Sequence, residues 1–592
     1  MTAHETPGFW RHYVFSTDHK MIAKQYYFTA LVMAVFAAVW SMLIRLQLAL
    51  PGHTWPFLSK LFPGLYQEGV LLPERYLSLV TMHGTVMIFF VISLALVSSF
   101  GNFVIPLQVG ARDMAYPFLN MLSYWTVVPA CLLMLGSFFA PDGAAGSGWT
   151  AYPPLSALSE AAPGSGLGQT LWILAMALWI ASFTMGGLNF ITTILNLRAR
   201  GMSMRRMPLA TWTFFIASVI GILCFPALTA AAIMLLLDRV GATSFFLPSG
   251  LVVAGQLLSY RGGGGSPLLF QHLFWFLGHP EVYVLVLPAL GIAFDVLAAG
   301  ARRPVYGYHT SIWALIVVAV LSMIVWGHHM FVSGMNPYVG EYFSIATVTI
   351  TAPFAVLAMN MVGTLWRAEI RLNTALLYAL AMIAAIGVGG IGGIFLATAT
   401  SDIYLHNSYF VVGHFHLMIA VVTFFGIFAG TYHWFPKLFG RMLNEALGRL
   451  HFWLTVPAVI VGFVAMHLLG MAGEQRHLYD PTAYAFLQPV QWLNVFISVV
   501  LGVAAAAQFV FLGNLFYSMF FGAPASENPW EATTLEWTTP SPAPHGNWPG
   551  EVPTVYCEPY EYRTGDDPHG YRSQATPGAK PPAAEPLPQA AR

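Results

Sequence analysis

Long apolar segments dominate this sequence and restrict what it can fold into. About twelve stretches are long enough to cross a bilayer, which takes about 20 consecutive apolar residues. Of the 592 residues, 57% are hydrophobic and 8% are charged, whereas soluble proteins carry about 25% charged residues. Lipid offers no partner to a backbone polar group, so spans of this length are helices. The sequence therefore predicts an all-α integral membrane protein, a bundle of about 12 transmembrane helices.

Two regions follow from this pattern. Residues 1–521 hold the predicted membrane domain, and residues 522–592 form a polar tail rich in Pro and Gly that we expect on the cytoplasmic surface. The predicted spans are 22–48, 80–106, 117–140, 170–198, 210–238, 268–300, 309–332, 341–366, 373–398, 404–434, 451–474 and 491–521.

Basic residues gather in the loops after the fourth, sixth, eighth and tenth spans. They are Arg198, Arg200, Arg205, Arg206, Arg302, Arg303, Arg367, Arg371, Lys437, Arg441 and Arg449. Loops rich in Lys and Arg stay in the cytoplasm. The N-terminus is therefore expected on the cytoplasmic side, with the protein crossing the membrane many times.

The charge balance excludes one class of partner. Lys and Arg together number 25, as do Asp and Glu, and a neutral chain of this kind is not expected to bind nucleic acid. The three cysteines lie far apart, so neither a disulfide framework nor a cysteine-ligated metal site is expected.

Six histidines lie inside the predicted spans or near their ends, where ionisable side chains are costly and commonly functional. The orientation above places all six at a similar depth, in the outer half of the bilayer. Structural histidines scattered over the bundle have no reason to share a depth, and a histidine proton relay of a transporter or channel would cross the whole membrane. The six are His83, His279, His328, His329, His414 and His416.

Helical geometry indicates how these histidines divide. His414 and His416 are two residues apart, about 200° around a helix, so they can bind two metals on opposite sides of it. Tyr283 follows His279 by one turn on the same face. Histidines in an apolar bundle suit heme iron and copper. Two can clamp a low-spin heme, one can hold a second heme with an open position, and three can hold a copper.

The order and spacing of several motifs carry a family resemblance. They are MHGTVMIFF, GARDMAYP, GWTAYPPLS, HLFWFLGHPEVY, WGHHMF and HNSYFVVGHFHLM. The chain resembles subunit I of the heme–copper oxidases, in the mitochondrial-like class. The resemblance runs from FSTDHKMIA (15–23) to LEWTTPSPAP (535–544).

This resemblance implies two hemes, expected to be of the a type, and one copper. It implies that His83 and His416 are the axial ligands of the low-spin heme, and that His414 is the proximal ligand of the high-spin heme. His279, His328 and His329 would hold the copper. Tyr283 matches the tyrosine that the family cross-links to the copper histidine, which would supply an electron and a proton when the O–O bond breaks.

Proton delivery is implied in the same way. Asp113 matches the proton-entrance acid of the family, and Glu281 matches its internal proton-branching acid. Asn120 and Asn189 match polar residues along the water path between them. From the residues alone, Asp113 could equally be an ordinary loop carboxylate or helix cap. A carboxyl inside the membrane such as Glu281 is expected to be neutral and able to carry a proton.

Several positions depart from the family pattern. Leu357 stands where the second proton route has a lysine, although Thr347 of that route is retained. The non-redox Mg/Mn site normally uses a His–Asp pair and here has His406–Asn407, which lowers its expected affinity for a hard cation. The paired arginines that hold heme propionates appear as Arg476–His477. Arg45 matches a residue near the low-spin heme tail.

The resulting expectation is a proton-translocating cytochrome-c oxidase that reduces O2 to water in the bacterial inner membrane. The alternatives are a nitric oxide reductase of the same superfamily, which often lacks the tyrosine and proton routes kept here, and a quinol oxidase. Quinol-using members have a histidine and a glutamine where this chain has Arg75 and Ser78. We therefore expect cytochrome c as donor, a subunit II with a dinuclear copper centre and a subunit III-like chain as partners, and membrane lipid as surroundings.

Overall fold

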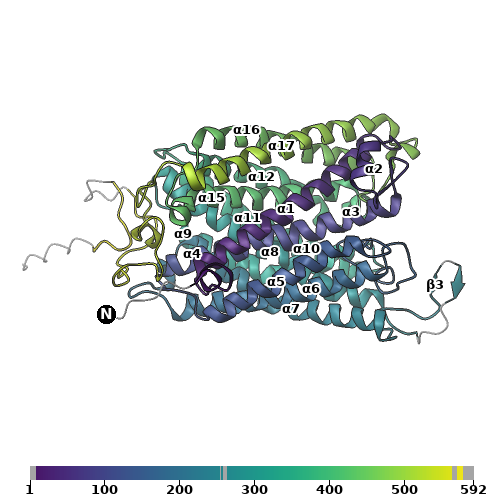
Figure 1. The fold of residues 1–592 in the computed structure, drawn as a ribbon, viewed down its shortest axis with the longest axis horizontal. Coiled ribbons are helices and arrows are strands. Elements are labelled where there is room, and N and C mark those ends of the chain that lie inside the picture. The colour runs from purple at the N-terminus through teal and green to yellow at the C-terminus, as the bar shows by residue number, and fades with distance from the viewer. Residues whose placement is uncertain (1–7, 254, 258–262, 563–569, 578–592) are drawn as a thin grey trace, which may run out of the picture.

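The computed structural model describes residues 8–253, 255–257, 263–562 and 570–577 as a bundle of long helices (Figure 1). In this part of the chain, eleven helices are long and apolar enough to cross a membrane. They cover His19–Ala49, Pro73–Val109, Pro117–Phe139, Leu167–Asn196, Leu209–Val240, Pro267–Ala301, Pro337–Leu365, Thr374–Ala397, Tyr409–Phe439, Glu445–Met471 and Gln488–Phe521.

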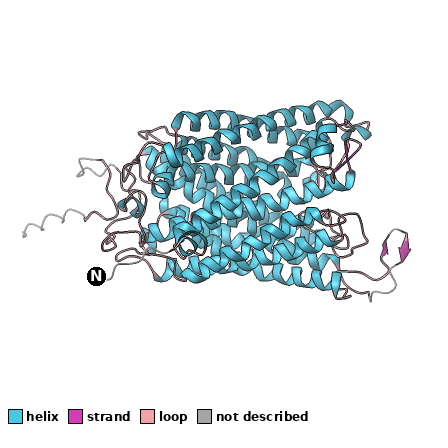
Figure 2. Ribbon diagram, viewed as in Figure 1, coloured by secondary structure: helices cyan, strands magenta, loops and turns pink. Residues whose placement is uncertain are grey.

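Some of these spans consist of consecutive helical segments, and the strands are confined to two short antiparallel hairpins (Figure 2). The segments are α1 His19–Ala49, α2 Pro56–Leu61, β1 Tyr66–Gln67, β2 Val70–Leu71, α3 Pro73–Thr85, η2 Val86–Phe100, α4 Gly101–Val109, α5 Pro117–Gly136, η3 Ser137–Phe139, α6 Leu167–Asn196, α7 Leu209–Val240, β3 Val252–Val253, β4 Gln256–Leu257, α8 Pro267–Ala301, α9 Tyr308–Ser322, η5 Trp326–Met330, α10 Pro337–Thr349, α11 Thr351–Leu365, α12 Thr374–Ala397, α13 Ala399–Leu405, α14 Tyr409–Phe415, η6 His416–Val421, α15 Val422–Phe439, α16 Glu445–Met471, α17 Gln491–Phe521 and η9 Leu535–Thr538.

Short polar side chains and prolines start several of these helices. Asp18 accepts a hydrogen bond from the backbone of Lys20 at 2.8 Å, and Asn373 and Asn444 cap α12 and α16 in the same way. Such caps satisfy amide groups that the first turn leaves unpaired. Proline occupies the first position of α3, α5, α8 and α10, where its missing N–H costs nothing.

The seventh predicted span differs from the expectation. The helix α9 ends at Ser322, ten residues before the predicted limit of 332, and a 3-10 turn follows from Trp326 to Met330. His328 and His329 therefore lie on a turn inside the bundle and not on a continuous helix. A 3-10 turn rises by about 2.0 Å per residue, against about 1.5 Å for an α-helix, so the chain still covers the depth.

The N-terminal residues and the tail lie at the same end of the bundle, on the left in Figure 1, and we call it the N-terminal end. The basic loops also meet the tail there. Glu531 of the tail pairs with Arg302 and, at 2.8 Å, with Arg371. Arg441 donates to Gly522 at 2.7 Å, and Val555 donates to the carbonyl of Arg200 at 2.8 Å. The predicted cytoplasmic loops are thus gathered at one end, as the loop charges require.

Part of the tail is more deeply packed than a polar surface segment would be. Leu535 is completely buried, and Glu536 and Trp537 are 1% and 4% exposed. The apolar side chains within the Pro-rich sequence provide these anchors. Residues 563–569 and 578–592 of the tail lie outside the described residues.

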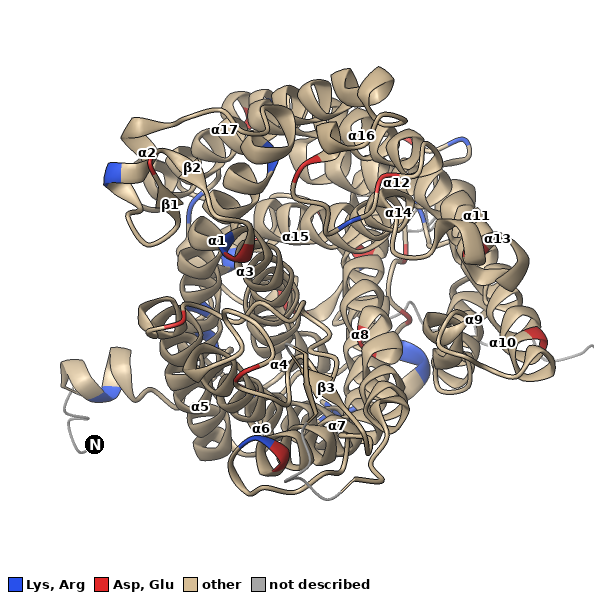
Figure 3. Cartoon of the chain, turned by 90° about the vertical axis from the view of Figure 1, so that its right-hand side faces the viewer, with Lys and Arg blue, Asp and Glu red and all other residues tan. Residues whose placement is uncertain are grey.

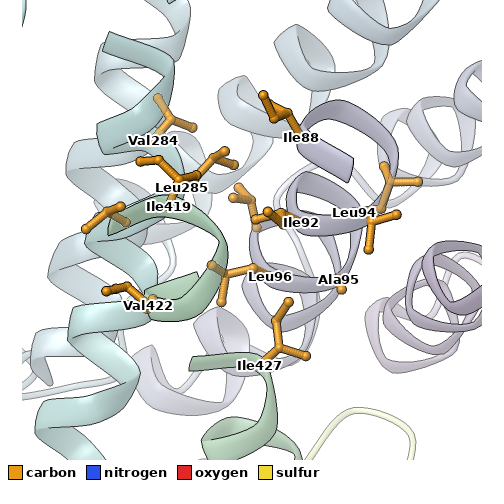
Figure 4. Packing of buried hydrophobic residues seen from close by; sticks show 14 of the residues in the cluster. Ile88, Ile92, Leu94, Ala95, Leu96, Val284, Leu285, Ile419, Val422 and Ile427 are labelled. Carbon is orange, nitrogen blue, oxygen red and sulfur yellow. The ribbon is translucent and has the colours of Figure 1, made fainter. Parts of the chain in front are cut away.

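The core of the bundle is apolar and nearly free of charge. Figure 4 shows Ile92 and Leu96 of η2 facing Leu285 of α8 and Val422 of α15. Seen along the bundle, Lys, Arg, Asp and Glu form a few isolated patches on an otherwise uncharged ribbon (Figure 3). A low-dielectric interior of this kind strengthens any electrostatic interaction made within it.

Candidate functional site

One large cavity of about 2070 Å³ lies inside the bundle. Sites for single small ligands commonly measure about 300–1,000 Å³, so this cavity has room for more than one large group. All six histidines singled out in the sequence line it: His83, His279, His328, His329, His414 and His416. The structure thus brings the six histidines together around one cavity.

His83 of α3 and His416 of η6 face each other across part of this cavity. Their rings are nearly parallel, with 8° between the planes and 6.3 Å between the centroids. The gap fits one metal ion held by a nitrogen of each ring at about 2 Å. The pair therefore suits a metal with two axial imidazoles, as in a low-spin heme.

Hydrogen bonds fix which nitrogen these rings can offer. Nδ1 of His83 lies 3.0 Å from the carbonyl oxygen of Ala37, and Nδ1 of His416 lies 2.8 Å from that of Val412. Nδ1 of His414 lies 2.8 Å from the carbonyl of Gly389. A carbonyl only accepts, so Nδ1 carries the proton in each ring and Nε2 keeps a free lone pair. This tautomer is the one that metal-binding histidines adopt.

His414 is the next-to-last residue of the α-helical segment α14, and His416 begins the π-helical segment η6. Single π turns often occur at functional sites. Gly393 of α12 lets the ring of His414 approach the helix closely, because a Cβ there would stand 2.9 Å from Cε1 and 3.5 Å from Nε2. Both residues also line the large cavity.

His279, His328 and His329 form the candidate metal group found among the described residues. One nitrogen from each ring lies within 4.8 Å of the other two. Nδ1 of His279 is 3.3 Å from Nε2 of His329. His328 lies close enough to His414 to interact with it electrostatically, so the trio faces the ring proposed for the second heme. Three neutral imidazoles at this spacing suit copper.

Neighbouring side chains orient the trio. Nε2 of His279 is 3.0 Å from the hydroxyl of Tyr283, which confirms that the two share a face of α8. Nδ1 of His328 is 3.0 Å from Oγ1 of Thr347, and Trp275 stacks on His329 with 3.6 Å between ring centroids. Each ring is thus held through a second contact, as ordered metal ligands are.

The cavity also presents two guanidinium groups. Arg45 and Arg476 line it, together with His477. Nε of Arg476 is buried and has no hydrogen-bond partner in the described part of the chain, and burial lowers the pKa of this guanidinium. An unsatisfied buried cation of this kind needs an anion, and the carboxylates of a heme would supply one.

Glu281 lies in α8 and is 3% exposed. Neither carboxyl oxygen has a hydrogen-bond partner among the described residues. A small cavity of about 20 Å³, lined by Tyr26, Ser123 and Ser182, also touches Val284 of the same helix. It can hold one water, which needs about 10–15 Å³. The hydroxyl of Tyr26 is 2.9 Å from that of Ser123 and 3.4 Å from that of Ser182.

Asp113 follows α4 at the N-terminal end. Its carboxylate accepts a hydrogen bond from the backbone of Met114 at 2.7 Å, and burial raises its pKa although the nearby His19 opposes this. Both side-chain amide atoms of Asn120 are buried and unpaired within the described residues, as they would be beside water. Asn189 has a different role, because both its amide atoms bind the backbone of Tyr116, at 2.9 and 3.1 Å.

The departures from the family pattern have structural counterparts. Leu357 is 1% exposed and fills the position of the lysine with apolar packing. Nδ1 of His406 binds Oδ2 of Asp402 at 2.9 Å. The sequence reasoning missed Asp402, although its spacing of four residues on a short helix could have indicated the pair. It also missed the buried Glu474, which no motif marks.

A helical membrane bundle that arranges six histidines around one cavity suits a membrane protein that binds redox metals. The family of cytochrome C and quinol oxidase polypeptide I matches residues 21–504. The chain belongs to this family and is the catalytic subunit of a terminal oxidase.

Similar proteins extend over nearly the whole chain. An alternative cytochrome c oxidase subunit 1 of Bradyrhizobium diazoefficiens is 46% identical over 557 residues, which cover 94% of this chain and 91% of the relative. Cytochrome c oxidase subunit 1 of Cereibacter sphaeroides is 38% identical, covering 91% of this chain and 95% of the relative. A heme–copper terminal oxidase solved as a dimer shares the fold, with a TM-score of 0.67 and 18% identity over 86% of this chain and 85% of the other.

Proposed function

We propose that this subunit reduces O2 to water at a high-spin heme and a copper, with electrons that arrive through a low-spin heme. In this proposal His83 and His416 hold the low-spin heme, His414 holds the high-spin heme, and His279, His328 and His329 hold the copper. The observation that carries it is the 6.3 Å separation of the parallel His83 and His416 rings, in the same cavity as the trio.

The heme and the copper together supply the electron-transfer chemistry, and the side chains around them supply protons and charge. Tyr283 places its hydroxyl beside His279, where it can donate a proton and an electron to the reaction. Arg476 neutralises the heme carboxylates. Asp113 takes up protons at the N-terminal end, and Glu281 passes them on. His406, with Asp402 beside it, provides a cation site of low affinity.

The proposal also includes the membrane, the partner subunits and the electron donor. The basic loops at the N-terminal end support a cytoplasmic N-terminus in a bacterial inner membrane. A subunit II with a dinuclear copper centre would pass electrons from cytochrome c, beside a subunit III-like chain, and proton translocation would be coupled to turnover. The two hemes are proposed to be of the a type.

Spectra of the purified complex test this assignment. We expect two hemes and one copper for each copy of the chain, measured by pyridine hemochrome and metal analysis. In reduced-minus-oxidised spectra, carbon monoxide should shift the bands of one heme only, because the other iron has two histidine ligands. Two hemes that both bind carbon monoxide, or a preparation without copper, would contradict the ligand assignment.

The donor can be tested separately. Arg75 donates to the backbone of Asp142, and Ser78 donates to Ala144 at 2.9 Å. Both residues hold the loop after α5, and neither is the histidine or the glutamine that quinol-using members carry there. Reduced cytochrome c should therefore support O2 consumption by the complex, whereas ubiquinol should not. Robust quinol oxidation that persists without the copper-bearing subunit would contradict the proposal that cytochrome c is the donor.

A further inference from the structure

A buried carboxyl group lies beside the low-spin heme region without belonging to the ligand set. Glu474 is in the segment between α16 and α17, outside the membrane-spanning helices, and is 0% exposed. Its Oε2 accepts a hydrogen bond from Nδ2 of Asn494 at 2.8 Å. Its Oε1 is buried without a hydrogen-bond partner in the described part of the chain. A permanently charged carboxylate would be poorly satisfied there.

Asn494 connects Glu474 to a buried arginine. Nη2 of Arg45 donates to Oδ1 of Asn494 at 3.0 Å and to its carbonyl at 2.8 Å. Arg45 also donates from Nη1 to the hydroxyl of Tyr409 at 3.4 Å. The backbone of Tyr409 donates to the carbonyl of Glu474 at 2.9 Å. The acid, the amide and the arginine thus form one rigid network across α1, α14 and α17.

Arg45 connects this network to the pair of histidines proposed to hold the low-spin heme. Its guanidinium lines the same cavity as His83 and His416, and it is close enough to interact electrostatically with His416. The ionisable groups that face Glu474 are Arg45, Tyr76 and Tyr409. In a low-dielectric interior, a charge change at one of two such neighbouring groups alters the proton affinity of the other.

Glu474 gains and loses its proton near neutral pH. Burial raises its pKa to about 7, although the hydrogen bond from Asn494 and the charge of Arg45 oppose this increase. Near neutral pH the group is therefore divided between its charged and neutral forms. A small electrostatic change is enough to shift the balance between them.

We propose that Glu474 is a redox-linked proton acceptor of the low-spin heme and acts through Arg45. This rests on the proposed heme at His83 and His416. When one electron from the donor reaches that heme, Glu474 binds one proton from water. When the electron moves on to the high-spin site, Glu474 releases that proton. The charge added by the electron is thus compensated within the network, and Glu474 is a positioning residue and not a ligand.

A redox titration of the purified complex tests the proposal. We expect the midpoint potential of the low-spin heme to fall as the pH rises through 7, because the charged carboxylate stabilises the oxidised form. A tenfold difference in proton affinity between the two redox forms corresponds to a shift of about 59 mV. Glu474→Gln should remove this dependence, and Asp480→Asn, a control in the same loop, should retain it. Redox-difference infrared spectra should lose the corresponding carboxylic acid signal in Glu474→Gln.

Two outcomes would overturn the proposal about Glu474. Both can be told apart from an error in the heme assignment. One is Glu474→Gln with a normal low-spin spectrum and an unchanged dependence of potential on pH. If Glu474→Gln does not retain the heme, Asn494→Leu decides. It removes both the donor to Oε2 and the link to Arg45, so it should abolish the dependence or move it to higher pH, whereas an unchanged dependence would overturn the inference. A wild-type complex that lacks a low-spin heme would instead refute the proposed function.

Discussion

His328→Ala is expected to remove the copper and nearly all O2 reduction, while the low-spin heme spectrum stays intact. The variant deletes one of three nitrogens that lie within 4.8 Å of one another. Loss of a mere supporting partner costs about 10–100-fold in metal affinity, so loss of a ligand should exceed 100-fold. His83 and His416 lie on other segments and keep their own hydrogen bonds. Metal analysis, optical spectra and O2 consumption measure the three quantities.

The matched control for this variant is His272→Ala. His272 is exposed on the same helix as His279, and Nδ1 of its ring accepts a hydrogen bond from Trp326 at 3.3 Å. Its loss removes an imidazole close to the trio without removing a member of it. Copper retained in His328→Ala, together with a loss of the low-spin band, would show that the two groups of histidines have been assigned the wrong way round.

Asp113→Asn is expected to lower steady-state O2 consumption by about 100-fold, the lower end of what a positioned acid or base contributes. Asparagine keeps an oxygen that can accept from the backbone of Met114, as Asp113 does at 2.7 Å, so the local fold should survive. The amide cannot exchange a proton. With Leu357 buried at the position of the second route, no lysine there can take over the supply.

Glu551→Gln is the control for this prediction, because Glu551 is an exposed acid of the tail at the same end of the bundle. It should leave O2 consumption unchanged. Heme and copper contents should be equal in both variants, so that a change in rate reflects proton supply. If Asp113→Asn keeps most of the wild-type rate with full cofactor content, protons enter by another route.

The fold was predictable because the membrane imposes it locally. Each span is a run of apolar residues, and the hydrogen-bonding requirement of the backbone in lipid leaves only the helix. The break after Ser322 was not predictable, because the segment beyond it remains apolar as far as Trp326. The turn is set by packing of the histidines inside the bundle, and hydropathy does not record such packing.

The site was predictable where one residue type is rare and its spacing is informative. Histidines inside spans stand out, and the offset of His414 from His416 indicates opposite faces. Glu474 could not be found in this way, because a glutamate in a polar loop carries no signal until tertiary contacts bury it. Asn189 shows the opposite case. Its match to a water path suggested a free amide, whereas the structure uses both amide atoms to hold Tyr116.

The junction between α14 and η6 has a mechanical consequence. In the proposed assignment, His414 and His416 attach the two irons to opposite sides of a single continuous segment. When the bundle fluctuates, that segment moves as a unit and carries both attachment points with it. The tunnelling distance between the two redox partners is therefore determined by covalent geometry within one stretch of backbone. Thermal motion of the surrounding helices therefore changes the distance between the two irons little. The rate of electron transfer between them stays nearly constant as a result.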